Sequence, residues 1–218
     1  MNSRTFGLNG NQLKLIALAA MTVDHIGILL LPEIILLRII GRLSFPIFAY
    51  MIAEGSGKTG NKAKYLLTVA GVALLCQAVY FVVIRSLYMC IMVTFTLSLI
   101  IIYTIDYART KKKVWAWLCA GAVLLGVIFI AAVVPERFPV GDFEIDYGII
   151  GILTPVLVYA GRNKKEKLVL IALANLLLSV AYPGVQWFGF AAILPLALYN
   201  GQRGKTNIKY YISFICGI

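Results

Sequence analysis

Asp24 and His25 are the residues of this sequence whose types most plainly suggest chemistry, and His25 is its single histidine. They lie in the stretch MTVDHIGILLL, within a run that is otherwise almost entirely apolar from 13 to 31. An aspartate at the centre of a membrane helix costs about 2.5–3.5 kcal/mol on the insertion scale. Such groups usually face a bundle interior, pair with one another and mark functional sites.

The two side chains need separate surroundings because neighbouring residues on a helix point about 100° apart. Asp24 shares its face with Ala17 and Ala20, whose small side chains allow close helix contact. Arg42, in the next apolar run, is the expected ion-pair partner of Asp24, since a lone charge in lipid is costlier than a paired one. The alternative is that this pair is purely structural and that His25 is a hydrogen-bonded packing residue.

The whole composition is that of a polytopic membrane protein. Of the 218 residues, 61% are hydrophobic and 13% charged, and the mean hydropathy is +0.90. We expect an all-α transmembrane bundle of about eight or nine segments forming one domain over residues 1–218. Eight apolar segments run at 13–31, 38–54, 65–84, 91–108, 114–134, 147–160, 168–182 and 187–200, and a ninth starts near Tyr210. The first segment lacks a signal-peptide cleavage pattern.

The distribution of basic residues predicts the orientation. With the N-terminus inside, 16 of the 20 Lys and Arg residues fall on the cytoplasmic side. The opposite side receives Arg38, Arg85 and Arg137, while Arg42 lies within the second segment. This bias follows the positive-inside rule, so we expect a cytoplasmic N-terminus. The cytoplasmic basic loops are then 56–64, 109–113, 161–167 and 201–209.

This topology predicts the depth of each polar residue. His25 is about 18 Å from the cytoplasmic start of its helix, past the midplane. Arg42 lies about one turn below the outer face, and Asp146 and Tyr147 open the sixth segment at that face. Glu54 lies near the inner end of the second segment. In the same segment, Pro46 is expected to kink the helix and free a carbonyl near Arg42.

Several other classes of site are excluded. The four cysteines have no CxxC spacing, so we expect free thiols within the membrane and no metal site. No exposed basic face of a soluble fold suggests nucleic-acid binding. The stretch GSGKT, which contains Lys58, lacks the first glycine of a phosphate loop and any preceding strand, which argues against ATP hydrolysis.

The stretch YNGQRG near the C-terminus is a candidate ligand loop. Its two glycines allow close backbone approach, and Arg203 offers a fork for phosphate or pyrophosphate. A helix end followed by positive-inside charge explains the same letters about as well.

Taken in order, LKLIALAAMTVDHIG, RIIGRLSFPIFAYMIAEG, DYGIIGIL and YNGQRG resemble the TraX family over nearly the whole chain. That family is named for a conjugation protein that acetylates the N-terminus of pilin in the bacterial inner membrane. The resemblance implies acetyl transfer from cytoplasmic acetyl-CoA to an acceptor on the far side, in the bacterial cytoplasmic membrane. One departure is that no Tyr-Pro-x-His-like element follows the YNGQRG loop.

We therefore predict an integral membrane acetyltransferase that acts on an amine or hydroxyl of a protein, glycan or small molecule. An imidazole suits the removal of a proton near neutral pH, so His25 is the expected base, in surroundings set by Asp24 and Arg42. The predicted acetyl-CoA-binding residues are Lys58, Asn200 and Arg203, and the predicted acceptor-binding residues are Glu54, Asp146 and Tyr147. The competing hypothesis is a proton- or ion-coupled transporter that uses the same intramembrane charges as a relay.

Overall fold

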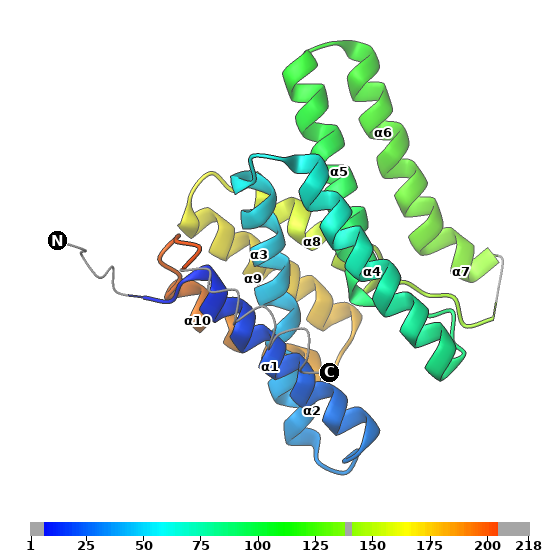
Figure 1. Cartoon of the computed structure of the whole chain (residues 1–218), viewed down its shortest axis with the longest axis vertical. Helices are drawn as coiled ribbons and strands as arrows, with labels where there is room; N and C mark the ends of the chain where they lie inside the picture. Colours follow the sequence, from blue (N-terminus) through cyan, green and yellow to red (C-terminus); the bar gives the residue numbers. More distant parts are fainter. Residues whose placement is uncertain (1–6, 138–140, 205–218) are drawn as a thin grey trace. The chain divides into compact units, whose positions relative to one another are not determined.

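The chain folds into helices joined by short turns (Figure 1). The computed structural model describes residues 7–137 and 141–204. Its elements are α1 (Gly10–Leu29), α2 (Ile35–Gly41), α3 (Ser44–Lys58), α4 (Lys62–Ile84), α5 (Ile91–Lys111), α6 (Val114–Ile128), the π-helical η1 (Phe129–Val133), α7 (Val134–Arg137), α8 (Gly148–Ala160), α9 (Lys164–Ala181), the 3₁₀-helical η2 (Val185–Ala192) and α10 (Ile193–Ala197). Within these residues there is no strand ladder, which confirms the all-α class.

Asparagine side chains define where three of the long helices begin. Asn9 precedes α1, and its side-chain oxygen accepts from the backbone N–H of Gln12 at 3.0 Å. The backbone N–H of Asn9 in turn donates to the side-chain oxygen of Gln12. The side chains of Asn61 and Asn163 likewise accept from backbone N–H groups, those of Lys64 and Glu166, at the starts of α4 and α9. Each cap satisfies a backbone donor that the first helical turn leaves unpaired.

Five helical stretches in the described chain are long and apolar enough to cross a membrane. They are Gly10–Leu29, Ile35–Lys58, Lys62–Val83, Ile91–Lys111 and Val114–Arg137. Helices Gly148–Ala160 and Val185–Ala197 are apolar but shorter. The membrane class is thereby supported, and the ninth predicted segment, near Tyr210, lies outside the described residues.

The predicted interruption of the second segment by Pro46 is confirmed. The helix breaks at Arg42 and Leu43, which form a turn, and α3 starts afresh at Ser44. Arg42 is four residues before Pro46, where a proline ring clashes with the backbone carbonyl and removes its helical hydrogen bond, and Pro46 itself lies in the first turn of α3. Arg42 is the C-cap of α2, and its backbone N–H still bonds to Ile39 O.

The eighth predicted segment, 187–200, is also not one helix. It forms the 3₁₀ run η2 followed by the five-residue α10. Pro195 has no N–H with which to continue an α-helical ladder, and Gly189 lowers helix propensity just before it.

The helices gather into two compact units, which are described separately. Unit 1 comprises Met1–Phe48 with Phe188–Ile218, and unit 2 comprises Ala49–Trp187. In unit 1, α1 and α2 form a tight hairpin (Figure 1). A Cβ at Gly27 would come within 2.8 Å of Leu37 Cβ, so the helices approach almost backbone to backbone.

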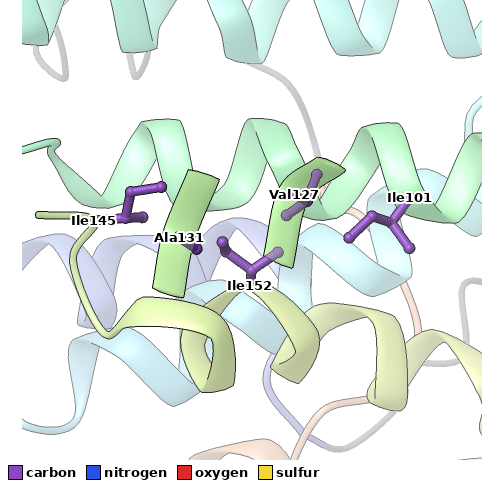
Figure 2. Packing of buried hydrophobic residues seen from close by; sticks show 5 residues of the cluster. All are labelled: Ile101, Val127, Ala131, Ile145 and Ile152. Atoms are coloured by element: carbon purple, nitrogen blue, oxygen red, sulfur yellow. The ribbon is translucent and has the colours of Figure 1, made fainter. Parts of the chain in front are cut away.

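Unit 2 packs α5 against α4, α6 and α8, and α8 against α9. Figure 2 shows the apolar cluster between these helices, formed by Ile101, Val127, Ala131, Ile145 and Ile152. A hydrogen bond also joins α5 to α8, because the hydroxyl of Ser98 on α5 donates to the carbonyl oxygen of Ile152 on α8 at 2.7 Å. Such hydrogen bonds hold membrane helices together where the hydrophobic effect does not act.

Candidate functional site

The predicted Asp24–Arg42 ion pair is confirmed within unit 1. Nη2 of Arg42 donates to Oδ1 of Asp24 at 2.9 Å and to Oδ2 at 3.0 Å. Both side chains are 13% exposed. The pair joins α1 to the turn that ends α2, so the charges are shielded by the helices they connect.

Glycine makes room for this carboxylate. Gly41 is buried on α2, and a Cβ built there would overlap the side chain of Asp24. On the α1 side, Ala17 and Ala20 are buried on the same face as Asp24, as their spacing predicted. The Asp24 carboxylate thus occupies a space that exists because position 41 has no side chain.

Arg38 is a second cation at this site that the sequence interpretation placed in the outer loop. Its Nη1 lies 3.7 Å from Oδ2 of Asp24, and its side chain is 31% exposed. The sequence did contain a signal for this second contact with Asp24, because residues four apart share a helix face and Arg38 and Arg42 have that spacing.

His25 is exposed and is held by its own helix. Nδ1 lies 2.9 Å from the carbonyl oxygen of Met21. Since a carbonyl only accepts, Nδ1 must carry the proton in this contact, and the neutral ring then has its lone pair on Nε2. The side chain is therefore oriented by one nitrogen and can accept a proton with the other, away from the face of Asp24.

The YNGQRG loop docks on the start of α1. The N–H groups of Gly10 and Asn11 donate to the carbonyls of Gln202 and Arg203 at 2.8 and 3.1 Å. Asn200 Oδ1 accepts from the N–H of Gln202 at 3.0 Å, so this predicted donor-binding side chain shapes the loop. The close backbone approach predicted from the glycines occurs, but its partner here is the protein itself.

Arg203 is exposed at this loop, while its backbone is tied to α1. The exposed side chain of this predicted cofactor-binding residue thus lies at the N-terminal end of α1. The positive end of the α1 dipole lies beside it.

In unit 2, Glu54 is buried between two lysines. Its Oε2 lies 2.6 Å from Nζ of Lys58 and its Oε1 lies 2.5 Å from Nζ of Lys167. A cationic acceptor would have to displace one of them. The GSGK letters that include Lys58 are helical to the end of α3, so they form no phosphate loop.

Asp146 and Tyr147 lie at the other end of α8 from Glu54, about 20 Å along the helix. The Tyr88 hydroxyl donates to Oδ1 of Asp146 at 2.9 Å. Burial and the nearby Asp146 carboxylate raise the pKa of Tyr88. Tyr147 adopts a left-handed conformation with φ of 58° and stacks edge-on against Tyr182. The three predicted acceptor-binding residues are therefore not brought together.

A further ionic cluster lies at the start of α4, around Lys62, and the sequence analysis did not predict it. Nζ of Lys62 and the hydroxyl of Tyr159 both approach Oδ2 of Asp106, at 2.6 and 2.7 Å. It links α4, α5 and α8. An acid near the end of an apolar run was the available signal, but nothing in the sequence indicated its partners.

Metal chemistry finds no support in the part of the chain that the structure describes. It contains no group of three or more His, Cys, Asp or Glu residues placed to hold an ion. Cys76, Cys90 and Cys119 are free thiols, as expected, and Cys216 lies outside the described residues.

Comparison with known proteins places these residues in a family. The model of the family described as TraX protein matches residues 9–216. An uncharacterized protein of Rickettsia prowazekii is 26% identical over 207 residues, covering 93% of this chain and 73% of its own length. A probable fimbrial assembly protein of Dichelobacter nodosus is 37% identical over 68 residues, covering 29% of this chain and 28% of its own length.

No solved structure matches the chain. The family match spans both compact units and includes the Asp24–Arg42 pair, His25 and the YNGQRG loop. This helical chain, with five stretches able to cross a membrane in its described part, belongs to the TraX family.

Proposed function

We propose that this protein is a membrane acetyltransferase that moves an acetyl group from acetyl-CoA to an amine or hydroxyl of an acceptor. The observation that carries the proposal is the geometry of His25. Its Nδ1 is engaged by Met21 O, which leaves Nε2 to act as a base, on a helix that the Asp24–Arg42 ion pair fixes to α2. Membership of the TraX family supports acetyl transfer as the proposed reaction.

In the proposed step, Nε2 of His25 takes the proton of the acceptor as its nitrogen or oxygen attacks the thioester carbonyl. A C–N or C–O bond forms, the C–S bond breaks, and the departing CoA thiolate takes the proton from Nε2 of His25, which returns the imidazole to its neutral form. The role of Asp24 and Arg42 is to fix the α1–α2 hairpin that carries His25. Neither needs to touch the reacting atoms.

We further propose a bundle of eight or nine spans acting as one domain in the bacterial cytoplasmic membrane, with its N-terminus inside. Acetyl-CoA would then approach from the cytoplasm, where Arg203 lies at the start of α1 and Lys58 at the end of α3. The acceptor, a protein terminus, a glycan or a small molecule, would approach from the other side. Asp146 and Tyr147 remain its proposed contacts.

The test compares wild type, His25→Ala and His25→Gln, each purified and incubated with labelled acetyl-CoA while thiol release is followed. We expect both variants to lose transfer, by about 10²–10⁴-fold for a missing general base. Glutamine can hydrogen-bond to Met21 O but cannot take a proton at neutral pH. Turnover by His25→Gln at the wild-type rate would refute the assignment of His25 as the base. Wild type that releases no thiol with any acceptor would refute the transferase proposal itself.

A further inference from the structure

The Asp24 carboxylate is surrounded by more positive charge than it can neutralise. Arg42 Nη2 and Arg38 Nη1 lie 2.9 and 3.7 Å from its oxygens. Two guanidinium groups against one carboxylate leave one positive charge in excess at this end of the α1–α2 hairpin. Glu33, in the turn between the helices, is exposed and forms no ion pair with a described residue.

The two arginines are not equivalent. Arg42 is fully engaged, because its Nη2 bonds to both carboxylate oxygens and its Nε donates to Arg38 O at 3.4 Å. The guanidinium of Arg38 reaches Asp24 only at 3.7 Å, which is beyond hydrogen-bond distance. Among the described residues it donates no hydrogen bond, and it is 31% exposed. N–H donors of Arg38 that do not face Asp24 can therefore bind an external acceptor.

The position of Arg38 is set by the close packing of the hairpin. A Cβ at Gly27 would lie 3.7 Å from both Cδ and the backbone N of Arg38, so the stem of the side chain runs along α1. Asp24, seated on Gly41, holds the charged end from the other side. A guanidinium held in this way loses little further freedom when it binds.

We propose that Arg38, backed by Arg42, forms a phosphate-binding site at the turn end of the α1–α2 hairpin. The planar fork of a guanidinium matches two oxygens of a phosphate group, and the excess positive charge needs an anion. That phosphate belongs to a lipid headgroup or to a soluble phosphate-bearing substrate. The site does not depend on acetyl transfer, since it rests on the charge and packing of the hairpin alone.

The experiment measures the melting temperature of the full chain, by tryptophan fluorescence, in dodecyl maltoside micelles, which contain no phosphate. Two probes are added separately, phosphatidylglycerol and soluble glycerol 3-phosphate. We expect at least one probe at ten times its dissociation constant to raise the melting temperature by about 3–6 °C. A shift with the lipid alone identifies a headgroup, and a shift with glycerol 3-phosphate identifies a site open to free phosphates.

Arg38→Gln should lose the shift, whereas Arg137→Gln should keep it. Arg137 is the matched control because it is exposed at the end of α7, away from this hairpin in the sequence. If Arg38→Gln does not fold, Arg38→Lys replaces it and should show a smaller shift than wild type, because an ammonium lacks the fork. A wild type that responds to neither probe, or an Arg38 variant with the full wild-type shift, would overturn the proposal.

Discussion

At the residue scale, Asp24 matters more to the hairpin than either arginine. Removing Asp24 leaves the largely buried guanidinium of Arg42, and that of Arg38, without their carboxylate, whereas removing Arg42 leaves Arg38 near the carboxylate. Losing one partner of a buried pair costs about 3–5 kcal/mol. We therefore predict that Asp24→Asn lowers the free energy of unfolding by an amount in that range and Arg42→Gln by less. Chemical unfolding in detergent measures both.

The control for this prediction is the double variant. Asp24→Asn with Arg42→Gln removes both charges, so its loss should be smaller than the sum of the single losses. Additive losses would mean that the two residues do not stabilise each other. Equal single losses would mean that Arg38 gives no compensation.

Asn175 presents the opposite case, a buried polar side chain without a partner among the described residues. It is 2% exposed in α9, and within the part of the chain that the structure describes neither Nδ2 nor Oδ1 has a hydrogen-bond partner. Each unpaired buried group costs about 1–3 kcal/mol. We predict that Asn175→Leu, which has the same branched shape and somewhat larger end groups, raises the free energy of unfolding by about 1–2 kcal/mol. Ser98→Ala, which removes the bond to Ile152 O, should lower it by about 0.5–1.5 kcal/mol.

A destabilised Asn175→Leu would show that the amide has a partner in the folded protein, such as a buried water. A stabilised variant would leave the question of why the chain keeps the residue. Its effect on thiol release from acetyl-CoA then answers that question, since lost transfer in a more stable protein marks a group kept for function.

At the element scale, the α1–α2 hairpin depends on glycine at one crossing point. Alanine at position 41 would overlap Asp24, so we predict that Gly41→Ala destabilises the protein by about 1–3 kcal/mol, as overpacking does. Gly71→Ala is the matched control, because Gly71 lies inside the helix α4 and a Cβ there would meet nothing within 4 Å. That variant should be neutral or more stable by about 0.5–1 kcal/mol. Thermal unfolding of both variants checks the contrast.

The loop before α8 has a contact that depends on pH. The Asp142 carboxylate accepts from the hydroxyl of Ser86 and, at 2.7 Å, from the N–H of Leu87, and these bonds lower its pKa. A lowered pKa in the folded state contributes stability above the unfolded pKa, and this is lost as pH falls through the folded value. We predict that Asp142→Asn melts earlier than wild type at pH 6.5, and that the difference shrinks below about pH 4. A difference that is unchanged at pH 3 would contradict it.

The helices were predictable where a single local rule decides them, and not elsewhere. Apolar length located five of the membrane-length stretches, because span length is set by the bilayer. The rule that proline interrupts a helix four residues before itself held at Pro46, since α2 ends at Arg42. At 187–200, where Gly189 and Pro195 weaken an α-helix, a 3₁₀ run and the short α10 replace the predicted single segment.

The site residues divide in the same manner. The cost of a lone charge in lipid predicted Asp24–Arg42, because Arg42 is the nearest intramembrane cation in the sequence. Of the two lysines that pair with Glu54, Lys167 was not predictable, since it is 113 residues away and no rule of spacing joins the two residues. The YNGQRG loop was read as open to a ligand because its letters do not reveal that α1 supplies the donors that occupy its carbonyls.

At the scale of the whole molecule, the charge asymmetry remains the argument for orientation. The stretch Val114–Arg137 has 24 residues, so its ends lie about 36 Å apart, a length sufficient to reach both sides of a bilayer. Lys113, the last residue of a basic run, comes directly before this stretch. Glu136 lies at its other end, and the acidic residues of the following loop come after it in the sequence. The positive-inside rule assigns the first end to the cytoplasm.

The prediction is that single cysteines at these two ends report opposite sides. In a background without Cys76, Cys90, Cys119 and Cys216, Glu136→Cys should react with a membrane-impermeant maleimide added to intact cells. Lys113→Cys should react only after the cells are opened, because both positions are exposed in the fold and differ only in side. Labelling of Lys113→Cys in intact cells, with Glu136→Cys protected, would reverse the orientation. The proposed entry of acetyl-CoA at Arg203 would then be untenable, since the start of α1 would face away from the cytoplasmic pool.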